Sequence, residues 1–190
     1  MIMNHVLPTA LGLLGAGFLT GQAAVFWNGH WYDAVLLDCT WEEARLDAQS
    51  KGGYLATIGS AAENTVAFDL VASNPAFWFN DAASNTEGPW LGGRQADPPP
   101  SEPAGGWGWH TGEPWAYANW ASGEPNNAGS GEERLVFFGH GIDNPQPTWN
   151  DVPQTAVMKG YILEIPEPAG TATAAALLLG AIAMGRRRRK

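Results

Sequence analysis

Apolar residues recur at helical spacing shortly after Thr40, a residue that can cap a helix. Glu43 follows three residues later, as in a capping box, and Gly52-Gly53 ends the stretch. The apolar positions between these limits are Trp41, Ala44, Leu46 and Ala48. The pattern predicts a short amphipathic helix that buries one face.

A second stretch of the same kind begins after Ser60. Glu63 again lies three residues beyond the capping position. The apolar positions that follow are Val66, Ala67, Leu70 and Val71. Their spacing predicts a second helix with one apolar face.

Short apolar runs further along the chain predict β-strands at residues 90–92, 135–138 and 161–165. Two long irregular stretches, 96–106 and 111–131, separate these runs. Loops of this length in a compact domain are uncommon, and they are usually functional or disordered. Their Trp and Tyr residues argue against disorder, so we expect ordered, functional loops.

The first 24 residues have the features of a secretory signal. An apolar run at residues 6–20 is followed by Gly21-Gln22-Ala23-Ala24, whose small residues suit a cleavage site. The alternative is a buried N-terminal helix, which Gly12, Gly15 and Gly17 disfavour. We therefore expect the folded domain to occupy residues 25–165.

The last 25 residues form three consecutive elements: Pro166-Glu167-Pro168, an apolar stretch at 169–185, and a basic cluster at 186–190. The apolar stretch is short for a bilayer span, which needs about 20 residues. By the positive-inside rule, the basic cluster would stay in the cytoplasm. The alternative to a removable tail is an ordinary tail anchor. Either arrangement places the middle domain outside the cytoplasmic membrane.

This ending resembles the PEP-CTERM sorting signal of Gram-negative bacteria. The resemblance implies that an exosortase-type transpeptidase recognises Pro166, Glu167 and Pro168 and removes the tail. It also implies transient membrane association through the tail. The expected location is the cell envelope, the outer surface or the extracellular matrix of a Gram-negative bacterium.

Charge is distributed unevenly along the chain. The formal net charge is -9, but without both ends the middle has 19 acidic residues and five basic ones, a net of -14. Such acidity disfavours nucleic acid as a partner. It suits a cation binder, although acidity also serves solubility alone. The lone cysteine, Cys39, allows no intramolecular disulfide.

Several short motifs in the middle region resemble those of C-type lectin domains, and they occur in that family's order. They are Thr40–Arg45 with Gly53–Ile58, Trp90–Gly93, Trp109–Gly112, Tyr117–Trp120, Gly123–Asn127, Trp149–Val152 and Tyr161–Glu164. The resemblance implies an α+β, C-type lectin-like fold. Two helices would flank small antiparallel sheets, with a long calcium-binding loop.

The resemblance also implies a calcium site. Calcium takes 6–8 oxygen ligands, and carboxylates and amide carbonyls suit it. The ligands implied here are Glu124, Asn126, Glu132, Asn150 and Asp151. In the family the Glu124–Pro125 bond would be cis, which turns the flanking side chains toward the ion. The alternative is that these residues satisfy only their own loop backbone, as Asx turns do.

Sugar binding in the family uses the same ligands. Glu124 with Asn126 would hold one sugar hydroxyl, and Glu132 with Asn150 would hold its neighbour. The Glu-Pro-Asn order goes with mannose, fucose, glucose or N-acetylglucosamine, and the reversed Gln-Pro-Asp order goes with galactose. We therefore expect a mannose-type glycan or exopolysaccharide as the partner. The alternative is a scaffold for protein adhesion or matrix structure that binds no sugar.

The sequence also suggests a second cation site, leaves two roles open for two tryptophans, and disfavours one class of function. A second calcium could lie near Asp97, Glu102, Asn127, Glu132 and Glu133. Trp107 and Trp115 could stack on a sugar or pack in the scaffold. An enzyme is not expected, because the chain has no HExxH zinc motif and no nucleophile elbow.

The chain departs from the family at its disulfides. By motif spacing, the family's paired cysteine positions hold Ala48 with Leu163, and Arg134 with Gln154. Loss of a native disulfide typically costs about 2–5 kcal/mol. Apolar contact between Ala48 and Leu163 could offset part of this loss. Bound calcium could offset more, because a ligand of the folded state stabilises it.

Overall fold

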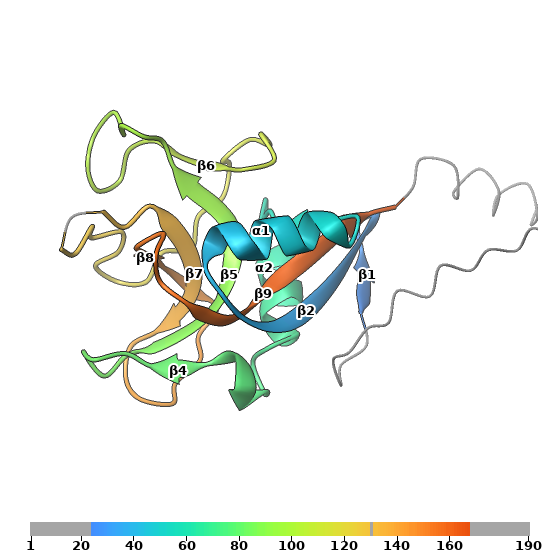
Figure 1. Ribbon diagram of the computed structural model, residues 1–190, viewed down its shortest axis with the longest axis horizontal. Coiled ribbons are helices and arrows are strands. Elements are labelled where there is room, and N and C mark those ends of the chain that lie inside the picture. Colours follow the sequence, from blue (N-terminus) through green and yellow to red (C-terminus); the bar gives the residue numbers. More distant parts are fainter. Residues whose placement is uncertain (1–23, 130, 168–190) are drawn as a thin grey trace, which may run out of the picture.

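The computed structural model describes residues 24–129 and 131–167 (Figure 1). The elements, in chain order, are β1 (Val25–Trp27), β2 (His30–Cys39), α1 (Trp41–Ser50), β3 (Tyr54–Leu55), α2 (Ala61–Asp69), the 3-10 turn η1 (Pro75–Phe77), β4 (Phe79–Asn80), β5 (Thr86–Gln95), β6 (Trp107–Trp109), β7 (Arg134–Gly139), β8 (Thr148–Val152) and β9 (Met158–Pro166). The combination of two helices with a largely antiparallel sheet confirms the α+β class.

The sheet joins the beginning of the domain to its end. Its main strand order is β1-β2-β9-β5-β7-β8, with β3 on β9 and β4 and β6 on β5. Strand β9 runs antiparallel to β2 from the His30–Pro166 pair to the Cys39–Met158 pair. The predicted strands at 90–92, 135–138 and 161–165 are confirmed, since they lie inside β5, β7 and β9.

Helix α1 has the predicted capping box: the Thr40 side chain accepts from the Glu43 backbone, and the Glu43 side chain accepts from the Thr40 N–H. Trp41, Ala44 and Ala48 are buried, as expected. The prediction for Leu46 is wrong, because its side chain is 51% exposed. Leu46 lies five residues beyond Trp41, about 140° around the helix, and so faces away from the buried stripe.

Helix α2 is capped by Ser60, whose side chain accepts from the Glu63 N–H. Leu70 and Val71 are buried as predicted, but they follow the last helical residue, Asp69. The helix also buries Asn64, a polar residue that the apolar pattern did not indicate.

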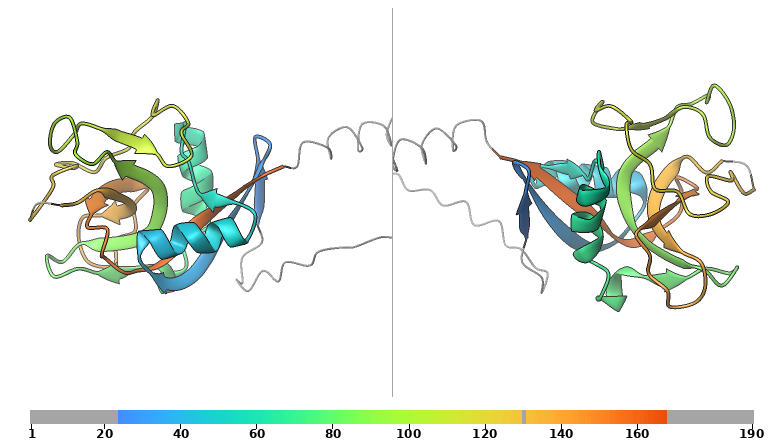
Figure 2. Two further views of the ribbon diagram at one scale, coloured as in Figure 1. Left: turned by 45° about the horizontal axis from the view of Figure 1, so that its top comes forward. Right: turned by 180° about the vertical axis from the view of Figure 1, so that it is seen from behind.

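The helices lie on opposite sides of the β2–β9 part of the sheet: α1 crosses its front in Figure 1, and α2 lies in front when the molecule is seen from behind in Figure 2. The core is correspondingly divided into two apolar clusters. Ala48 and Leu163 both belong to the cluster beside α1, where each is at most 1% exposed. The two positions that correspond to one disulfide of the family therefore form part of the apolar core in this chain.

Cys39 lies buried in the same cluster as a free cysteine. Burial is the main cause that raises the pKa of its thiol to about 12, and nearby Glu43 adds to the effect. Only the thiolate is nucleophilic, so this cysteine is an inert core residue.

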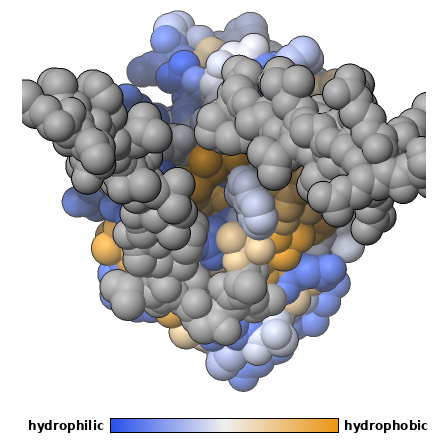
Figure 3. Space-filling view, turned by 90° about the vertical axis from the view of Figure 1, so that its right-hand side faces the viewer, coloured by the Kyte–Doolittle hydropathy of each residue, from blue (hydrophilic) through white to orange (hydrophobic). Residues whose placement is uncertain are grey.

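The domain ends lie together, at the side opposite β7 and β8 (Figure 1). Apolar surface is visible from this end (Figure 3), and the exposed large side chains of β1 and β2 include Phe26 and Trp31, whose rings lie 5.1 Å apart. Pro166 closes β9, and the Glu167 N–H donates to the Gly29 carbonyl oxygen at 3.0 Å.

The predicted signal and tail fall outside the described residues, apart from Ala24, Pro166 and Glu167. Neither helix in residues 24–129 and 131–167 has the length and apolar run that a membrane crossing requires.

Candidate functional site

The long loop lies beside β8. The Trp149 N–H donates to the Asn119 carbonyl, and the Ala121 N–H donates to the Trp149 carbonyl, both at 2.9 Å. Trp120 and Trp149 form a parallel bridge. The loop thus acts as a short extra strand, and this pairing brings Glu124 and the residues after it to Asn150 and Asp151.

An aromatic cluster supports this junction from inside. The Trp149 ring is fully buried and lies within 6.1 Å, centroid to centroid, of the rings of Trp109, Trp115, Tyr117 and Trp120. Trp115 also lies against the buried ring of Trp107. Trp107 and Trp115 are therefore scaffold residues in this structure. The packed rings of Trp115, Tyr117 and Trp120 also agree with the expectation that the aromatic part of this loop is ordered.

Asp151 holds the turn of the loop. Its side chain is fully buried, and its two oxygens accept from the backbone N–H groups of Asn126 at 3.0 Å and Asn127 at 2.8 Å. The Glu124–Pro125 bond just before this turn is cis. The buried carboxylate is therefore held by the same loop segment that carries Glu124 and Asn126.

Asn126 and Glu132 converge on a single donor. The Ala128 N–H lies 2.7 Å from Asn126 Oδ1 and 2.6 Å from Glu132 Oε2. Asn127 Oδ1 accepts from the N–H groups of Gly131 and Glu132. Asn127 thereby positions Glu132, a role that the sequence reasoning missed. The signal available was an Asn in a turn, because Asn tolerates the left-handed φ of 48° found here.

The three carboxyl groups of the site influence one another. Burial, followed by the negative charge of Asp151, raises the pKa of Glu132 to about 7. Burial and then Asp151 also raise the pKa of Glu124, and burial raises that of Asp151. None of these three carboxylates forms an ion pair within residues 24–129 and 131–167, and a bound cation would favour their charged forms.

Two oxygen atoms at this site test whether a cation fits. Glu124 Oε2 and Asn150 Oδ1 are both buried, and neither has a hydrogen-bond donor among the described residues. An unsatisfied buried acceptor costs about 1–3 kcal/mol. Both atoms are hard oxygen ligands of the kind that calcium prefers. The residues present therefore fit a calcium ion.

The site depends on its amide residues. No three His, Cys, Asp or Glu side chains in residues 24–129 and 131–167 are grouped to hold a metal ion. A calcium site here therefore requires Asn126 and Asn150 in addition to the carboxylates. The same observation applies to the proposed second ion, because its acidic residues Asp97, Glu102, Glu132 and Glu133 form no such group.

Two of the candidate calcium ligands also support the loop backbone, which is the alternative role considered for them. Asn126 Oδ1 accepts from the N–H two residues on, as in an Asx turn, and Asp151 is satisfied by backbone donors. Support of the loop backbone does not explain Glu124 Oε2 or Asn150 Oδ1, which have no donor in the described part of the chain.

The second pair of disulfide positions is also close in space. The Arg134 Nη2 group donates to Gln154 Oε1 at 3.1 Å. A polar contact therefore connects β7 to the segment after β8, where the resemblance implied a lost covalent bond.

Comparison with known proteins supports the same fold. No protein-family model matches the chain. Pulmonary surfactant-associated protein D of Sus scrofa is 34% identical over 115 residues, which are 59% of this chain and 25% of that protein. A perlucin-like protein of Mytilus galloprovincialis is 28% identical over 123 residues, or 64% of this chain and 67% of that protein.

Among solved structures, the cow C-type carbohydrate-recognition domain of CD23, in the presence of GlcNAc2Man3 oligosaccharide, matches with a TM-score of 0.57. The match is 22% identical and covers 79% of this chain and 98% of that one. The chain therefore has the C-type lectin-like fold, as the motif order predicted. Neither of these two relatives is named for an enzymatic activity. The chain spans about a quarter of the length of the surfactant protein it matches.

Proposed function

We propose that residues 25–165 form an exported, calcium-dependent carbohydrate-binding domain. The ligands would be Glu124, Asn126, Glu132, Asn150 and Asp151. The observation that carries the proposal is the pair of buried oxygens, Glu124 Oε2 and Asn150 Oδ1, which lack donors among the described residues beside two further carboxylates. A calcium ion would supply the missing positive charge and coordinate sugar hydroxyls.

The side chains of the site would recognise a sugar in two pairs. Glu124 would accept a hydrogen bond from one hydroxyl, and the Asn126 amide would donate to the same oxygen. Glu132 and Asn150 would do the same for the neighbouring hydroxyl. This acid-then-amide order supports a mannose-type preference. The relation to a carbohydrate-recognition domain supports carbohydrate as the ligand class.

Calcium binding is tested by calorimetric titration of a metal-free fragment of residues 24–167, which retains the Pro166 and Glu167 contacts. We expect saturable binding and a higher unfolding midpoint with calcium, because the ion binds only the folded state. Replacing Asn150 and Asp151 by Ala should abolish binding. Ala at Asn144, an exposed asparagine outside the site, is the matched control. A folded fragment that binds no calcium would leave a scaffold for protein adhesion or matrix structure.

Sugar preference is tested by competition on immobilised mannan with calcium present. Mannose should compete better than galactose. The double substitution Glu124→Gln with Asn126→Asp should reverse this order, because it exchanges donor and acceptor positions. Stronger competition by galactose than by mannose with the unchanged protein would contradict the proposed preference.

A further inference from the structure

A second cleft lies between β5, β6 and β7, away from the oxygens of Glu124 and Asn150. Its volume is about 510 Å³. The lining residues that matter here are Arg94, Gln95, Gly108, Trp109, Glu133 and Arg134. Two of the five basic residues of the middle region therefore line one cleft, together with the acidic residues Asp97 and Glu133.

These two arginines oppose each other directly. Arg94 of β5 and Arg134 of β7 are register partners, so their side chains leave the sheet on the same face. Like charges at such a position destabilise the sheet. Neither guanidinium lies within ion-pair distance of a carboxylate in the described residues. An anion between the two guanidinium groups would remove this repulsion.

Unsatisfied polar atoms are concentrated around the same cleft. Six buried side-chain polar atoms lack a hydrogen-bond partner among the described residues, and four of them belong to residues that line this cleft. Two are donors, Arg134 Nε and Trp109 Nε1, and two are acceptors, Gln95 Oε1 and Glu133 Oε2. Buried polar groups are usually paired. Gln95 and Trp109 alternate with Arg94 and Gly108 along β5 and β6, so their side chains point to the opposite face of the sheet. Of the four atoms, Arg134 Nε is the one that lies on the face of the two arginines.

The cleft is open beside Arg94. Gly108 of β6 is the register partner of Arg94, and a Cβ atom placed there would meet no atom within 4 Å. Strand β6 therefore contributes no side chain opposite Arg94. The remaining space lies next to the guanidinium group of Arg94.

We propose that this cleft binds a hydroxylated carboxylate, specifically a hexuronate unit of an acidic polysaccharide. The carboxylate would lie between Arg94 and Arg134 and accept charge-assisted hydrogen bonds from both. The sugar hydroxyls would donate to the carboxylate of Asp97, which lines the same cleft. A neutral sugar offers the two guanidinium groups no charge-assisted hydrogen bond. This site needs no calcium, and its lining includes none of the residues Glu124, Asn126, Glu132, Asn150 and Asp151.

The test is calorimetric titration of the full chain with glucuronate in the presence of a calcium chelator. Binding of glucuronate should be saturable, and glucose should bind at least about tenfold more weakly, because it lacks the charge-assisted bonds. Arg94→Gln removes an exposed charge and should weaken glucuronate binding by about tenfold. Arg45→Gln, in which an arginine paired with Glu42 is lost, is the control and should bind normally.

Gly108→Val provides a second test that keeps both charges. A valine suits a strand, and its Cβ meets no neighbour, so the fold should be retained while the side chain occupies ligand space. We expect loss of glucuronate binding. Unchanged affinity in both Arg94→Gln and Gly108→Val, equal binding of glucose, or no binding of glucuronate by the folded chain would each overturn the proposal.

Discussion

Single buried carboxyl groups determine much of the behaviour of this protein, and they act in different ways. Asp151 is fully buried and accepts two backbone hydrogen bonds from the loop. Those donors keep the turn in place while the pKa of Asp151 is raised by burial. Part of the loop geometry is therefore held by the protein's own backbone donors. The unpaired oxygens of Glu124 and Asn150 complete the argument for a cation.

Glu87 provides a pH prediction at a residue outside both proposed ligand sets, and its charge contributes to the raised pKa of Glu132. It lies in β5 between its register partners Phe79 and Phe138. Burial is the main cause that raises its pKa to about 7, and the charge of Asp81 adds to the effect. The folded state thus holds this proton more tightly than the unfolded chain does. Its contribution to stability is full below about pH 4.5 and is lost as the pH rises through about 7.

Glu87→Gln, which stays neutral, should therefore be more stable than the unchanged protein at pH 8, by about 1–2 kcal/mol after allowance for partial exposure. The two proteins should have similar stability near pH 4. Urea unfolding at both pH values, with a chelator present, measures the difference. Glu113→Gln, at an exposed loop position, is the control. An equal difference at both pH values would contradict this account of Glu87.

At the scale of elements, one polar side chain connects α2 to β8 and the loop before it. Asn64 Oδ1 accepts from Trp149 Nε1, and Asn64 Nδ2 donates to the Pro147 carbonyl, both at 2.8 Å. The Asn119 side chain donates to the same carbonyl at 2.7 Å. The helix, the long loop and β8 therefore meet at one hydrogen-bonded point beneath the candidate calcium site.

Asn64→Ala should destabilise the domain by about 1–3 kcal/mol, because it leaves the buried Trp149 N–H without an acceptor. Calcium affinity should fall as well, since Trp149 precedes Asn150 directly. Urea unfolding and calcium titration measure the two effects. Thr65→Ala, an exposed position on the same helix, should leave calcium affinity unchanged. If Asn64→Ala unfolds at the same urea concentration as the unchanged protein, the proposed link is wrong.

The strands show why local patterns predicted some elements and missed others. The runs inside β5, β7 and β9 are buried on both faces, so they appear as continuous apolar stretches. The two-residue strands β3 and β4 are too short to give any pattern. They are strands only because β9 and β5 lie beside them.

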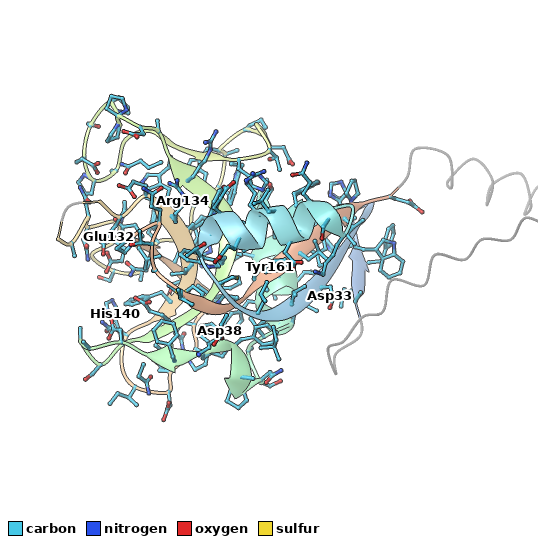
Figure 4. All side chains as sticks on the ribbon, viewed as in Figure 1. Asp33, Asp38, Glu132, Arg134, His140 and Tyr161 are labelled. Atoms are coloured by element: carbon cyan, nitrogen blue, oxygen red, sulfur yellow. The ribbon has the colours of Figure 1, made fainter. Side chains whose placement is uncertain are left out.

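At the scale of the molecule, the candidate calcium site and the domain ends lie at opposite sides. Glu132 is at the far left of Figure 4, and the end of β9 is at the right. A chain held at its C-terminal end would therefore present Glu132 and its neighbours away from the attachment point. This arrangement suits a binding domain that is sorted by its tail.

The proposed sorting signal gives a prediction at this scale. Pro166 and Glu167 are exposed where β9 ends, which suits recognition by an exosortase, and Pro168 lies outside the described residues. Glu167→Ala should leave the tail uncleaved in an exosortase-containing Gram-negative host. Mass spectrometry of the envelope protein measures this. Glu113→Ala, at an exposed position far along the chain, should be cleaved normally. Normal cleavage of the Glu167→Ala protein would contradict the proposal.

The sequence alone determined the caps of both helices, three strands, the expected loops and the order of the family motifs, because these are local patterns. It also indicated the candidate ligands, but only through a resemblance. The tertiary structure decided which of their atoms lack partners, since Asn150 becomes an unsatisfied acceptor only after β8 and the long loop pair. It alone placed Arg94 opposite Arg134, forty residues away in the chain, because strand register is set by packing and long-range pairing.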